Sequence, residues 1–589
     1  MLRLVTRPHS PLYYEALIAA RVDPVMARLF AARGVASATQ LAPQLAHLIA
    51  PAQMRGIATA AELLADAIIE RQQLLIVADY DADGATACAV AIRALRAMGG
   101  RVDYLVPNRF DFGYGLTPEI VRLAQQRRPD ILITVDNGIA SVEGVAEANR
   151  LGMRVIVTDH HLPGAALPAA AAIVNPNQPG CEFPSKHLAG VGVIFYLLLV
   201  LRRELRDRGV FSGKSALSET GALPDSVVPA LGAVPRLGAI AEPKLASLLD
   251  IVALGTIADV VRLDDNNRRL VAQGLARIRA GQACAGIRAL LRVAGREAGK
   301  ATSYDLGFVV GPRLNAAGRL TDMSLGIECL ITDDEARAGE IASQLDALNQ
   351  QRRQIETGMQ ETALAKLEGV DPRDNFTLCM FEPDWHQGVI GILASRLKDR
   401  FHRPAIAFAR GGDGMLKGSG RSIAALHLRD ALDLVAKRHP GLIAKFGGHA
   451  AAAGLTIAEA GLPLFVQAFE AISRGLLSPA DLTQVLETDG ELSASQITIE
   501  LAVAMQGIVW GQGFPPPRFD GVFIVENQRF VGEKHLKLAV RNGAVQFEAI
   551  RFFEPSLLPQ TVRLIYRPEA NEFNGSRRLQ LVIEHWEPA

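Results

Sequence analysis

The chain has 589 residues, enough for roughly three or four domains of ordinary size. Apolar residues make up 49% of it and charged residues 21%, which is typical of a globular protein and excludes a disordered chain. Lys+Arg and Asp+Glu both number 62. This zero balance excludes a uniformly basic nucleic-acid coat protein, but it is compatible with a local basic cleft.

The cysteine spacing and the length of the apolar runs exclude further classes of protein. The five cysteines are far apart and form no CxxC pair, which argues against a disulfide framework and a zinc ribbon. The longest apolar run, around residues 191–201, is far shorter than the ~20 residues that a membrane span needs. The first ten residues lack a basic-then-apolar signal pattern. We therefore expect a cytoplasmic protein that does not bind a membrane.

The first 330 residues predict an extension followed by an α/β domain. Residues 1–70 are rich in Ala and Leu with Pro breaks, and they predict an N-terminal helical extension. Residues 71–330 then alternate between short apolar runs and helical segments. Such alternation with continuous apolar strands predicts a parallel sheet covered on both faces. The expected strands are 74–79, 101–107, 130–136, 154–159 and 171–176.

The later part of the chain changes pattern several times. A buried helix is expected at 190–205, and a Gly/Pro/Ser-rich insertion or long loop at 209–243. Residues 331–369 predict a long polar-faced helix that connects two domains. A second α/β domain is expected over 370–475, and short alternating runs over 485–589 predict a small β-barrel or sandwich.

Polar clusters follow four of the predicted strands of the first sheet. Parallel sheets bind ligands outside the carboxyl ends of their strands, so these clusters are expected to converge. A single strand-terminal Asp is more often a helix cap, but here five aspartates and two histidines are expected to converge. That many carboxylates would repel one another unless cations neutralised them. Carboxylates with imidazole suit Mn²⁺ or Mg²⁺, and paired ions ~3.5–4 Å apart are usual in phosphoester cleavage. The clusters are Asp79–Gly84, Pro107–Arg109, Asp136–Gly138 and Asp159–His161.

Four motifs resemble those of the DHH phosphoesterase superfamily: DYDADG (79–84), VDNG (135–138), DHH (159–161) and GTIADVV (255–261). Downstream, WHQGVIGILASRL (385–397), GSGRS (418–422) and GGHAAAAG (447–454) resemble its accessory domain. With PNRF…GYG (107–115), the whole order resembles the single-strand-specific 5′→3′ exonucleases of that superfamily. The resemblance implies a parallel-sheet DHH domain, a second α/β accessory (DHHA1-like) domain and a C-terminal OB-like β module.

The resemblance also implies a site that holds two ions, Mn²⁺ or Mg²⁺. Carboxylates can span two ions, and Asp136 is the expected bridging ligand. Asp79 and Asp159 are expected to orient ligands and water, and His161 to stabilise charge at the scissile phosphate. Relatives that act on small substrates place a His four residues before the DxD pair, where this chain has Val77. The implied metal ligands are Asp81, Asp83, Asp136, His160 and Asp259.

Other residues are candidates for contacts with phosphate. Arg109 follows a strand beside the metal edge, and the GSGRS motif is expected to be a Gly-flanked loop that an anion can approach. His449 is either a core residue of a tight strand crossing or a phosphate contact, and the resemblance favours the contact. The candidates are Arg109, Arg313, Ser419, Arg421 and His449.

The resemblance implies a metal-dependent exonuclease that degrades single-stranded DNA 5′→3′ to mononucleotides in DNA repair and recombination. The alternatives are a phosphodiesterase for short oligonucleotides or cyclic dinucleotides, and a catalytically dead DNA-binding scaffold. The chain lacks a GxxxxGK[ST] loop, so a helicase would have to supply single strands, and a single-strand-binding protein is a second implied partner. We expect a monomer whose OB-like module guides the strand. Candidates for base stacking, or for the module's core, are Trp510, Phe514, Phe519 and Phe530.

Overall fold

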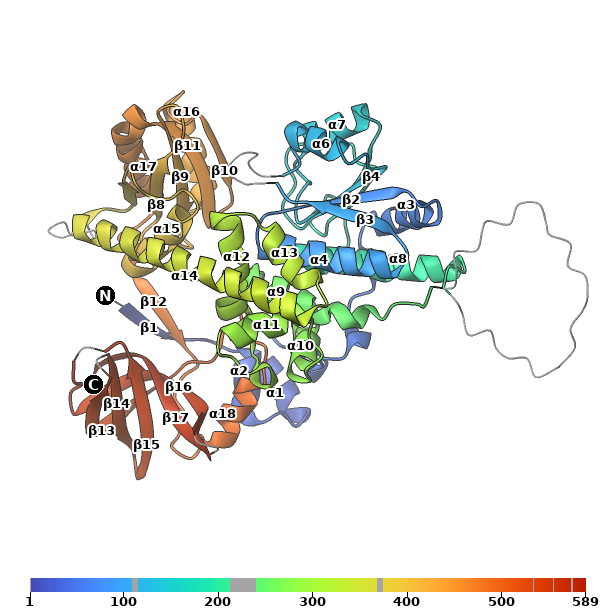
Figure 1. Cartoon of the computed structure of the whole chain (residues 1–589). Helices are drawn as coiled ribbons and strands as arrows, with labels where there is room; N and C mark the ends of the chain where they lie inside the picture. The colour runs from blue at the N-terminus through green and yellow to red at the C-terminus, as the bar shows by residue number, and fades with distance from the viewer. Residues whose placement is uncertain are drawn as a thin grey trace, which may run out of the picture. The chain divides into compact units, whose positions relative to one another are not determined.

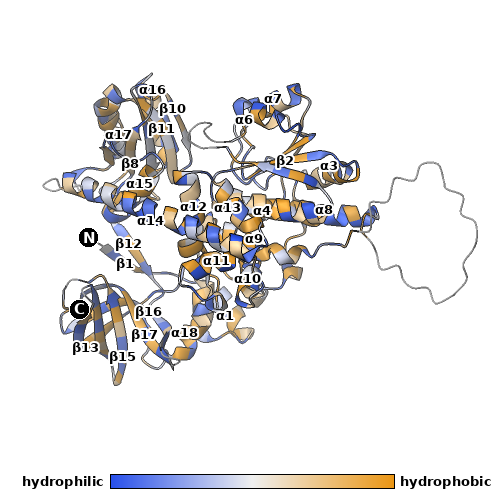
Figure 2. Ribbon diagram, viewed as in Figure 1, coloured by the Kyte–Doolittle hydropathy of each residue, from blue (hydrophilic) through white to orange (hydrophobic). Residues whose placement is uncertain are grey.

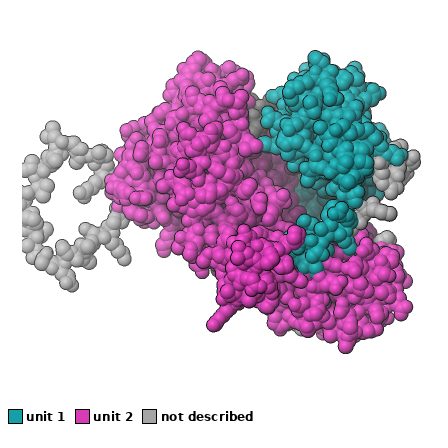
Figure 3. All heavy atoms as spheres, turned by 180° about the vertical axis from the view of Figure 1, so that it is seen from behind, with its two compact units in different colours: residues 1–7, 347–490 teal, residues 8–346, 491–589 magenta. Residues whose placement is uncertain are grey.

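The structure is a computed structural model, and it describes residues 2–107, 115–211, 240–367, 374–532, 534–554, 556–573 and 576–589 (Figure 1). These residues form two compact units, which Figure 3 colours separately. One comprises residues 1–7 and 347–490, and the other comprises residues 8–346 and 491–589. Apart from its two ends, the loop expected at 209–243 lies outside the described residues.

Five parallel strands form the large sheet of the second unit, in the spatial order β3-β2-β4-β5-β6. Residues of α6 and α7 pack on one face, and α4 and α8 contact the other (Figure 1). Because both faces are covered, the inner strands β2, β4 and β5 are nearly continuous apolar runs, whereas the edge strand β3 alternates between exposed and buried residues. The predicted α/β fold is thus confirmed. The strands are β2 Gln73–Ala78, β3 Arg101–Leu105, β4 Ile131–Val135, β5 Arg154–Thr158 and β6 Ala172–Val174.

Helix α4 (Ala82–Ala97) lies at the centre of this unit and is buried from its first residue through Ile92. It contacts α8 (Gly190–Asp207), which is the buried helix expected at 190–205, and α9 (Leu249–Ala258). Its Ala-rich sequence suits this place because small side chains let helices pack closely. The other helices of the unit are α3 Ile57–Ile69, α6 Pro118–Gln125, α7 Val142–Arg150, α10 Asp265–Arg279, α11 Ala285–Val293, α12 Gly311–Leu320 and α13 Ser324–Ile331.

The sequence predicted that the N-terminal 70 residues are helical, but the structure shows that they are helical only in part. Helices α1 (Pro11–Ala19) and α2 (Pro24–Ala31) are present, and both begin with Pro directly after a capping side chain. The segment before them is instead strand β1 (Leu2–Thr6), which pairs in parallel with β12 (Gln484–Thr488). A five-residue strand stabilised by a partner more than 470 positions away gives no local signal.

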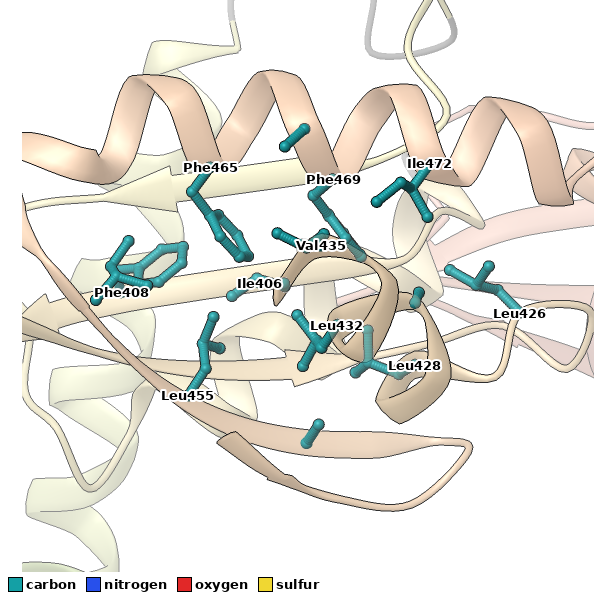
Figure 4. Close-up of a cluster of buried hydrophobic side chains, with 14 of the residues drawn as sticks. Ile406, Phe408, Leu426, Leu428, Leu432, Val435, Leu455, Phe465, Phe469 and Ile472 are labelled. Carbon is teal, nitrogen blue, oxygen red and sulfur yellow. The ribbon is translucent and has the colours of Figure 1, made fainter. Parts of the chain in front are cut away.

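The accessory domain has a mixed sheet in the order β10-β11-β9-β8-β7. Helices α16 and α17 pack against it around a core of Phe408, Phe465, Phe469 and aliphatic neighbours (Figure 4). GSGRS, expected to be a loop, instead forms the end of β9, because its glycines face Phe408, Leu455 and Leu428. The elements are β7 Leu378–Phe381, α15 Ile390–Phe401, β8 Ala405–Arg410, β9 Met415–Arg421, α16 Leu428–Arg438, β10 Lys445–Gly448, β11 Ala452–Ala458 and α17 Leu462–Leu476.

The C-terminal module is a closed barrel in the order β13-β14-β15-β17-β16, which confirms the predicted β-barrel. Burial alternates along its strands, and Figure 2 shows hydrophilic and hydrophobic residues on the same strands. Helix α18 (Ile499–Gln506), which contacts β16 and β17, was not predicted. The strands are β13 Phe519–Val531, β14 His535–Asn542, β15 Val545–Phe552, β16 Thr561–Phe573 and β17 Ser576–Pro588.

A long helix, α14 (Glu335–Lys366), occurs where a connecting helix was predicted. Its first residues belong to the unit with the parallel sheet, and its later residues belong to the unit with the accessory domain. Among the helices that the structure describes, none has the length and apolar character needed to span a membrane.

Candidate metal centre

The register of the parallel sheet brings three strand-terminal aspartates side by side. Ala78 of β2 pairs with Val135 of β4, and Val135 pairs with Thr158 of β5. The next residue on each strand is therefore an aspartate in the same row: Asp79, Asp136 and Asp159. Strand order reverses between β2 and β4, since β3 lies on one side of β2 and the later strands on the other. Ligands of parallel sheets bind at such a switch point.

The loop after β2 supplies two further aspartates with different surroundings. Asp81 caps α4, and its Oδ1 accepts hydrogen bonds from the backbone amides of Asp83 (2.9 Å) and Gly84 (3.0 Å). This leaves the second carboxylate oxygen of Asp81 for another partner. Asp83 is buried, and it accepts hydrogen bonds from the first amides of α8, Gly190 at 2.6 Å and Val191 at 2.9 Å.

His160 lies at the centre of the acidic cluster. Its Nε2 is 3.1 Å from Asp136 Oδ1, 3.5 Å from Asp259 Oδ2 and 4.0 Å from Asp83 Oδ2. Three groups of side chains bring their ligand atoms within 4.8 Å of one another, as a metal site requires. The groups are Asp136–His160–His161, Asp83–His160–Asp259 and Asp79–Asp81–Asp136.

The carboxylates of this cluster are held under strong mutual repulsion. Burial and the charge of the neighbouring Asp81 together raise the pKa of Asp83 to about 7, although hydrogen bonds from the Gly190 and Val191 amides act to lower it. Burial and the surrounding carboxylates raise the pKa values of Asp136 and Asp259 well above the ordinary range. Clustered carboxylates with such raised pKa values bind divalent cations readily, since a cation removes the repulsion. The oxygen and imidazole donors present fit Mn²⁺ and Mg²⁺.

The two adjacent histidines have opposite electrostatic environments. Burial and the charge of His161 lower the pKa of His160 to about 4, so its ring is neutral and able to bind a metal. Burial alone would also lower the pKa of His161, but its 2.8 Å hydrogen bond to Asp159 raises that pKa to about 9. Asp159 also accepts hydrogen bonds from the amides of His160 (2.7 Å) and Ile139 (2.9 Å), which fix its orientation.

Two helices pack closely against the acidic cluster through glycines that the sequence analysis did not single out. A Cβ on Gly190 would lie 2.6 Å from Asp136 Cβ, and one on Gly255 would lie 3.1 Å from Asp83 Oδ1 and 2.1 Å from Thr86 Oγ1. The 2.6 Å and 2.1 Å distances are shorter than real Cβ contacts, and 3.1 Å is tighter than most, so a larger residue would displace its neighbours, the Asp136 carboxylate among them. Nothing in the sequence around Gly190 signals this role.

Backbone strain accompanies the central aspartate. Asp136 has φ +63°, a conformation rare for residues other than glycine, and such strain persists where surrounding structure fixes it. Asn137 stabilises this turn, because its side-chain amide donates to the carbonyls of Val77 (3.1 Å) and Val135 (2.9 Å). Val77 itself is buried in the sheet core. The three groups of candidate metal ligands therefore form without a ligand at position 77.

The segment GPRLNAAGRL (311–320), which contains Arg313, packs beside the loop that carries Asp81 and Asp83. Asn315 Oδ1 accepts a hydrogen bond from the Ala82 amide at 2.9 Å, and a Cβ on Gly318 would lie 1.9 Å from the Tyr80 carbonyl. Arg313 is buried and pairs with Asp346, with Nη2 2.8 Å from Oδ1. This motif therefore contacts the loop that carries Asp81 and Asp83. Arg109 lies outside the described residues.

The remaining phosphate candidates are in the accessory domain, which belongs to the other unit. Arg421 Nη1 is 3.3 Å from Ser419 Oγ and 2.8 Å from the Gly420 carbonyl. Both side chains border the first turn of α15, because a Cβ on Gly391 would lie 2.9 Å from Ser419 Oγ and 3.1 Å from Arg421 Nη2. His449 is exposed in the turn between β10 and β11, so it is not a core residue.

Two of the four aromatic candidates of the C-terminal module pack against the N-terminal helices. Phe30 of α2 stacks against Trp510 and Phe514, with ring centroids 6.3 Å apart in both pairs. The Arg268 guanidinium lies 4.2 Å from the centre of the Phe514 ring. Phe519 is fully buried in the barrel, whereas Phe530 is 45% exposed. Of these four rings, Phe530 is thus the one that a nucleobase can reach most easily.

Comparison with known proteins places this geometry in a family. Family profiles match residues 73–217 (DHH family, N-terminal domain), 374–474 (DHHA1 domain) and 488–585 (RecJ OB domain). The single-stranded-DNA-specific exonuclease RecJ of Dickeya dadantii is 50% identical over 576 residues, which are 96% of both chains. The Escherichia coli RecJ is 49% identical, with the same coverage. The chain belongs to the RecJ family.

Solved RecJ structures share the fold over the whole chain. RecJ from Thermus thermophilus in complex with Mn²⁺ matches with a TM-score of 0.81 at 28% identity, covering 100% of this chain and 79% of that one. The same protein in complex with Mg²⁺ matches with a TM-score of 0.75, covering 78% of its chain. The three predicted parts, DHH domain, DHHA1 domain and OB module, are therefore confirmed.

Proposed function

We propose that this RecJ-family chain is a metal-dependent exonuclease that degrades single-stranded DNA 5′→3′ to mononucleotides. The observation that carries the proposal is the neutral His160 ring among three carboxylates, with the cationic His161 next to it. Such a cluster suits phosphodiester hydrolysis, in which negative charge develops on the phosphate. Relatives with about half of the residues identical are named single-stranded-DNA-specific exonucleases.

We assign the metal ions to the acidic cluster. The residues that would hold Mn²⁺ or Mg²⁺ are Asp81, Asp83, Asp136, His160 and Asp259. Asp136 and His160 each belong to two of the three groups, and Asp136 is the proposed bridging ligand because a carboxylate can bind two ions. Two divalent ions, when bound, would activate a water and stabilise charge on the phosphate. Asp79 would orient water or a ligand from the same row of strand ends.

His161 and Asp159 are proposed to act on the phosphate and not as metal ligands. The protonated His161 would donate a hydrogen bond to a phosphate oxygen, and this bond would strengthen as charge develops. Asp159 would keep His161 protonated and oriented through their 2.8 Å hydrogen bond. This division of labour explains why neighbouring imidazoles need opposite charge states.

Recognition of the strand is assigned to other residues. Arg421 and Ser419 beside the α15 N-terminus would bind a terminal phosphate, because arginine, a hydroxyl and backbone amides suit an anion with three oxygens. His449 would contact the phosphate backbone from its exposed turn. Arg109 is proposed for the same role on the resemblance alone. Arg313 would have to divide the hydrogen bonds of its guanidinium between Asp346 and the phosphate.

The second candidate is a phosphodiesterase for short oligonucleotides or cyclic dinucleotides. The closed barrel at residues 519–588 disfavours it, because a two-nucleotide substrate needs no extended binding surface. In the cell we propose a cytoplasmic monomer that acts in DNA repair and recombination. A helicase and a single-strand-binding protein would be its partners, the former because it would supply single strands from duplex DNA.

The test is digestion of an oligonucleotide labelled at each end in turn, with Mn²⁺, Mg²⁺ or EDTA. We expect mononucleotides from the 5′ end first, little digestion of blunt duplex, and no product in EDTA. Asp136→Asn should lower the rate by at least about 10³-fold, since several kcal/mol of transition-state stabilisation depend on the cluster. Activity in EDTA, or release from the 3′ end first, would refute the proposal.

A further inference from the structure

An exposed aromatic pair lies on the unit that carries the acidic cluster. Tyr304 is 58% exposed and Phe308 is 67% exposed, although both are large apolar rings. Their rings stack, with centroids 5.0 Å apart and an angle of 23° between the planes. Burying such rings stabilises a fold, so an exposed stacked pair points to a ligand with a flat face.

The local backbone holds this pair in place. Residues Asp305–Val310 form a π-helical segment between Tyr304 and α12, and π-helical turns are frequent at functional sites. Asp305 fixes the start of the segment, because its carboxylate accepts hydrogen bonds from both the amide and the hydroxyl of Thr302, each at 2.8 Å. The two rings therefore project from an anchored turn rather than from a loose loop.

The same segment is seated against the helix that ends at a candidate metal ligand. A Cβ on Gly307 would lie 3.0 Å from Ile257 Cγ2, and one on Gly311 would lie 3.1 Å from Ala258 Cβ. Asp259 is the next residue of that helix, and its carboxylate is 3.5 Å from His160 Nε2. The C-terminal side of the segment thus adjoins the acidic cluster.

The other end of the segment adjoins the approach to the barrel. Ser303 Oγ donates to the Trp510 carbonyl at 2.8 Å, and the Leu263 amide donates to the Gln512 carbonyl at 2.7 Å. Residues 303–311 would span on the order of 12 Å at helical rise. The aromatic pair therefore lies between the acidic cluster and the segment that leads into the OB barrel, all within one unit.

Further features of this surface suit a nucleic-acid strand. Val260 is 64% exposed at φ +60°, directly after Asp259, and Arg262 is exposed two residues later. A cation near exposed aromatic rings provides both phosphate attraction and base stacking, which single-strand-binding surfaces combine. Stacking also tolerates any base, as an exonuclease requires.

We propose that Tyr304 and Phe308 form a stacking platform for an unpaired nucleobase of the bound strand, beyond the nucleotide at the metal centre. The proposal rests on the proposed function, because it takes the strand to run from the acidic cluster towards the barrel. It adds a base-binding site to residues that have no role in metal binding. The platform holds the strand while its end is cleaved.

A scan with abasic sites tests the platform directly. A 5′-phosphorylated oligonucleotide with one abasic site at each position in turn is bound in EDTA, and affinity is measured by fluorescence anisotropy. We expect one or two internal positions at which loss of the base weakens wild-type binding about tenfold, within the range of one base–aromatic stack. Phe308→Ala should weaken binding of the intact strand similarly and should be insensitive to the abasic site at those positions.

Conservative variants separate stacking from general apolar packing. Phe308→Tyr should keep the wild-type abasic profile, whereas Phe308→Leu, which is apolar without a π face, should lose it. Thermal midpoints should match the wild type because both side chains are largely exposed. A flat wild-type profile, or the same profile in Phe308→Ala, would overturn the platform.

Failure of the platform is distinguishable from failure of the metal centre. With Mn²⁺ and saturating strand, Phe308→Ala should keep the wild-type maximal rate and show a KM raised about tenfold. If Asp136→Asn were fully active while the abasic profile held, the metal assignment would fail and the platform would stand. A lowered maximal rate with unchanged KM in Phe308→Ala would contradict base binding.

Discussion

At the scale of single residues, the candidate site depends on how neighbours set charge. His160 and His161 are consecutive, yet the pKa of one is lowered to about 4 and that of the other is raised to about 9. The difference comes from Asp159, which hydrogen-bonds to the ring of His161 at 2.8 Å. One imidazole can thus serve as a neutral metal ligand while its neighbour remains a cation.

Replacing Asp159 should therefore change the pH profile and not only the rate. In Asp159→Asn burial is no longer opposed by the carboxylate, so the pKa of His161 falls and the cation is lost at lower pH. We expect the alkaline limb of the profile for bound substrate to move down by about one unit or more. Asp130→Asn, at the opposite end of the same sheet, should leave the profile unchanged. A uniformly lower rate with an unmoved limb would contradict this role.

The raised pKa of Asp136 predicts the stability of the metal-free protein. Between the ordinary carboxyl pKa and the raised value, the folded chain keeps a proton that the unfolded chain has released. Stability should therefore fall as pH rises through this window. In EDTA at pH 8, Asp136→Asn should be more stable than wild type by about 1–3 kcal/mol, because it removes a buried carboxylate.

Denaturant unfolding in EDTA at several pH values measures this effect. The advantage of Asp136→Asn should shrink towards pH 4, where the carboxyl is protonated in the folded wild type and becomes about half protonated in the unfolded chain. With Mn²⁺ present the order should reverse, because the wild type binds the ions and the variant binds them weakly. A variant less stable than wild type in EDTA at pH 8 would show that repulsion does not dominate.

At the scale of elements, the sequence predicted the parallel sheet and its functional edge. Buried parallel strands are continuous apolar runs, and each of these runs is followed directly by polar residues. The sequence also showed that the aspartates would converge, because strand ends of a parallel sheet share one edge. The pairing of Ala78 with Val135 and of Val135 with Thr158, which puts the aspartates in one row, needed the structure.

Features that depend on distant partners were not predictable. Strand β9 alternates glycine with polar residues, a pattern typical of loops, and it is a strand because its glycines lie against Phe408 and Leu455. Gly190 lies in an apolar helical stretch whose sequence gives no hint of the adjacent Asp136 carboxylate. Asn315 was not singled out from the sequence, although its side chain accepts a hydrogen bond from the amide of Ala82, which directly follows Asp81.

The start of α8 gives an element-scale prediction. Gly190→Ala would place a Cβ within 2.6 Å of Asp136 Cβ, so α8 or the aspartate must move. We expect weaker Mn²⁺ binding and a loss of about 1–3 kcal/mol in stability. Gly339→Ala in α14 is the matched control, because nothing lies within 4 Å of its Cβ and alanine favours a helix. Calorimetric Mn²⁺ titration and thermal melts decide: equal effects of the two changes would exclude close packing as the cause.

At the scale of the whole molecule, the OB barrel is part of the unit that holds the DHH sheet. Trp510 and Phe514 pack on Phe30, and β12 pairs with β1. A truncation near residue 485 would therefore unpair the N-terminal strand and expose Phe30, which is buried in the whole chain. Single substitutions are therefore the cleaner way to separate binding from folding. Arg421 and Ser419, two of the candidates for end recognition, lie in the other unit and can be changed without touching the acidic cluster.

Direction of digestion requires a group that recognises the strand end, and we predict that Arg421 supplies it. A terminal 5′-phosphate carries nearly two charges and three oxygens, which a guanidinium beside Ser419 and the α15 amides binds better than an internal diester. Arg421→Ala should reduce the preference for 5′-phosphate over 5′-hydroxyl ends by about ten- to a hundredfold, with Mn²⁺ dependence intact. Arg410→Ala, an exposed arginine of the same sheet, should retain the preference. Initial rates on the two oligonucleotides decide: an unchanged ratio in Arg421→Ala, or the same loss in Arg410→Ala, would place recognition of the end elsewhere.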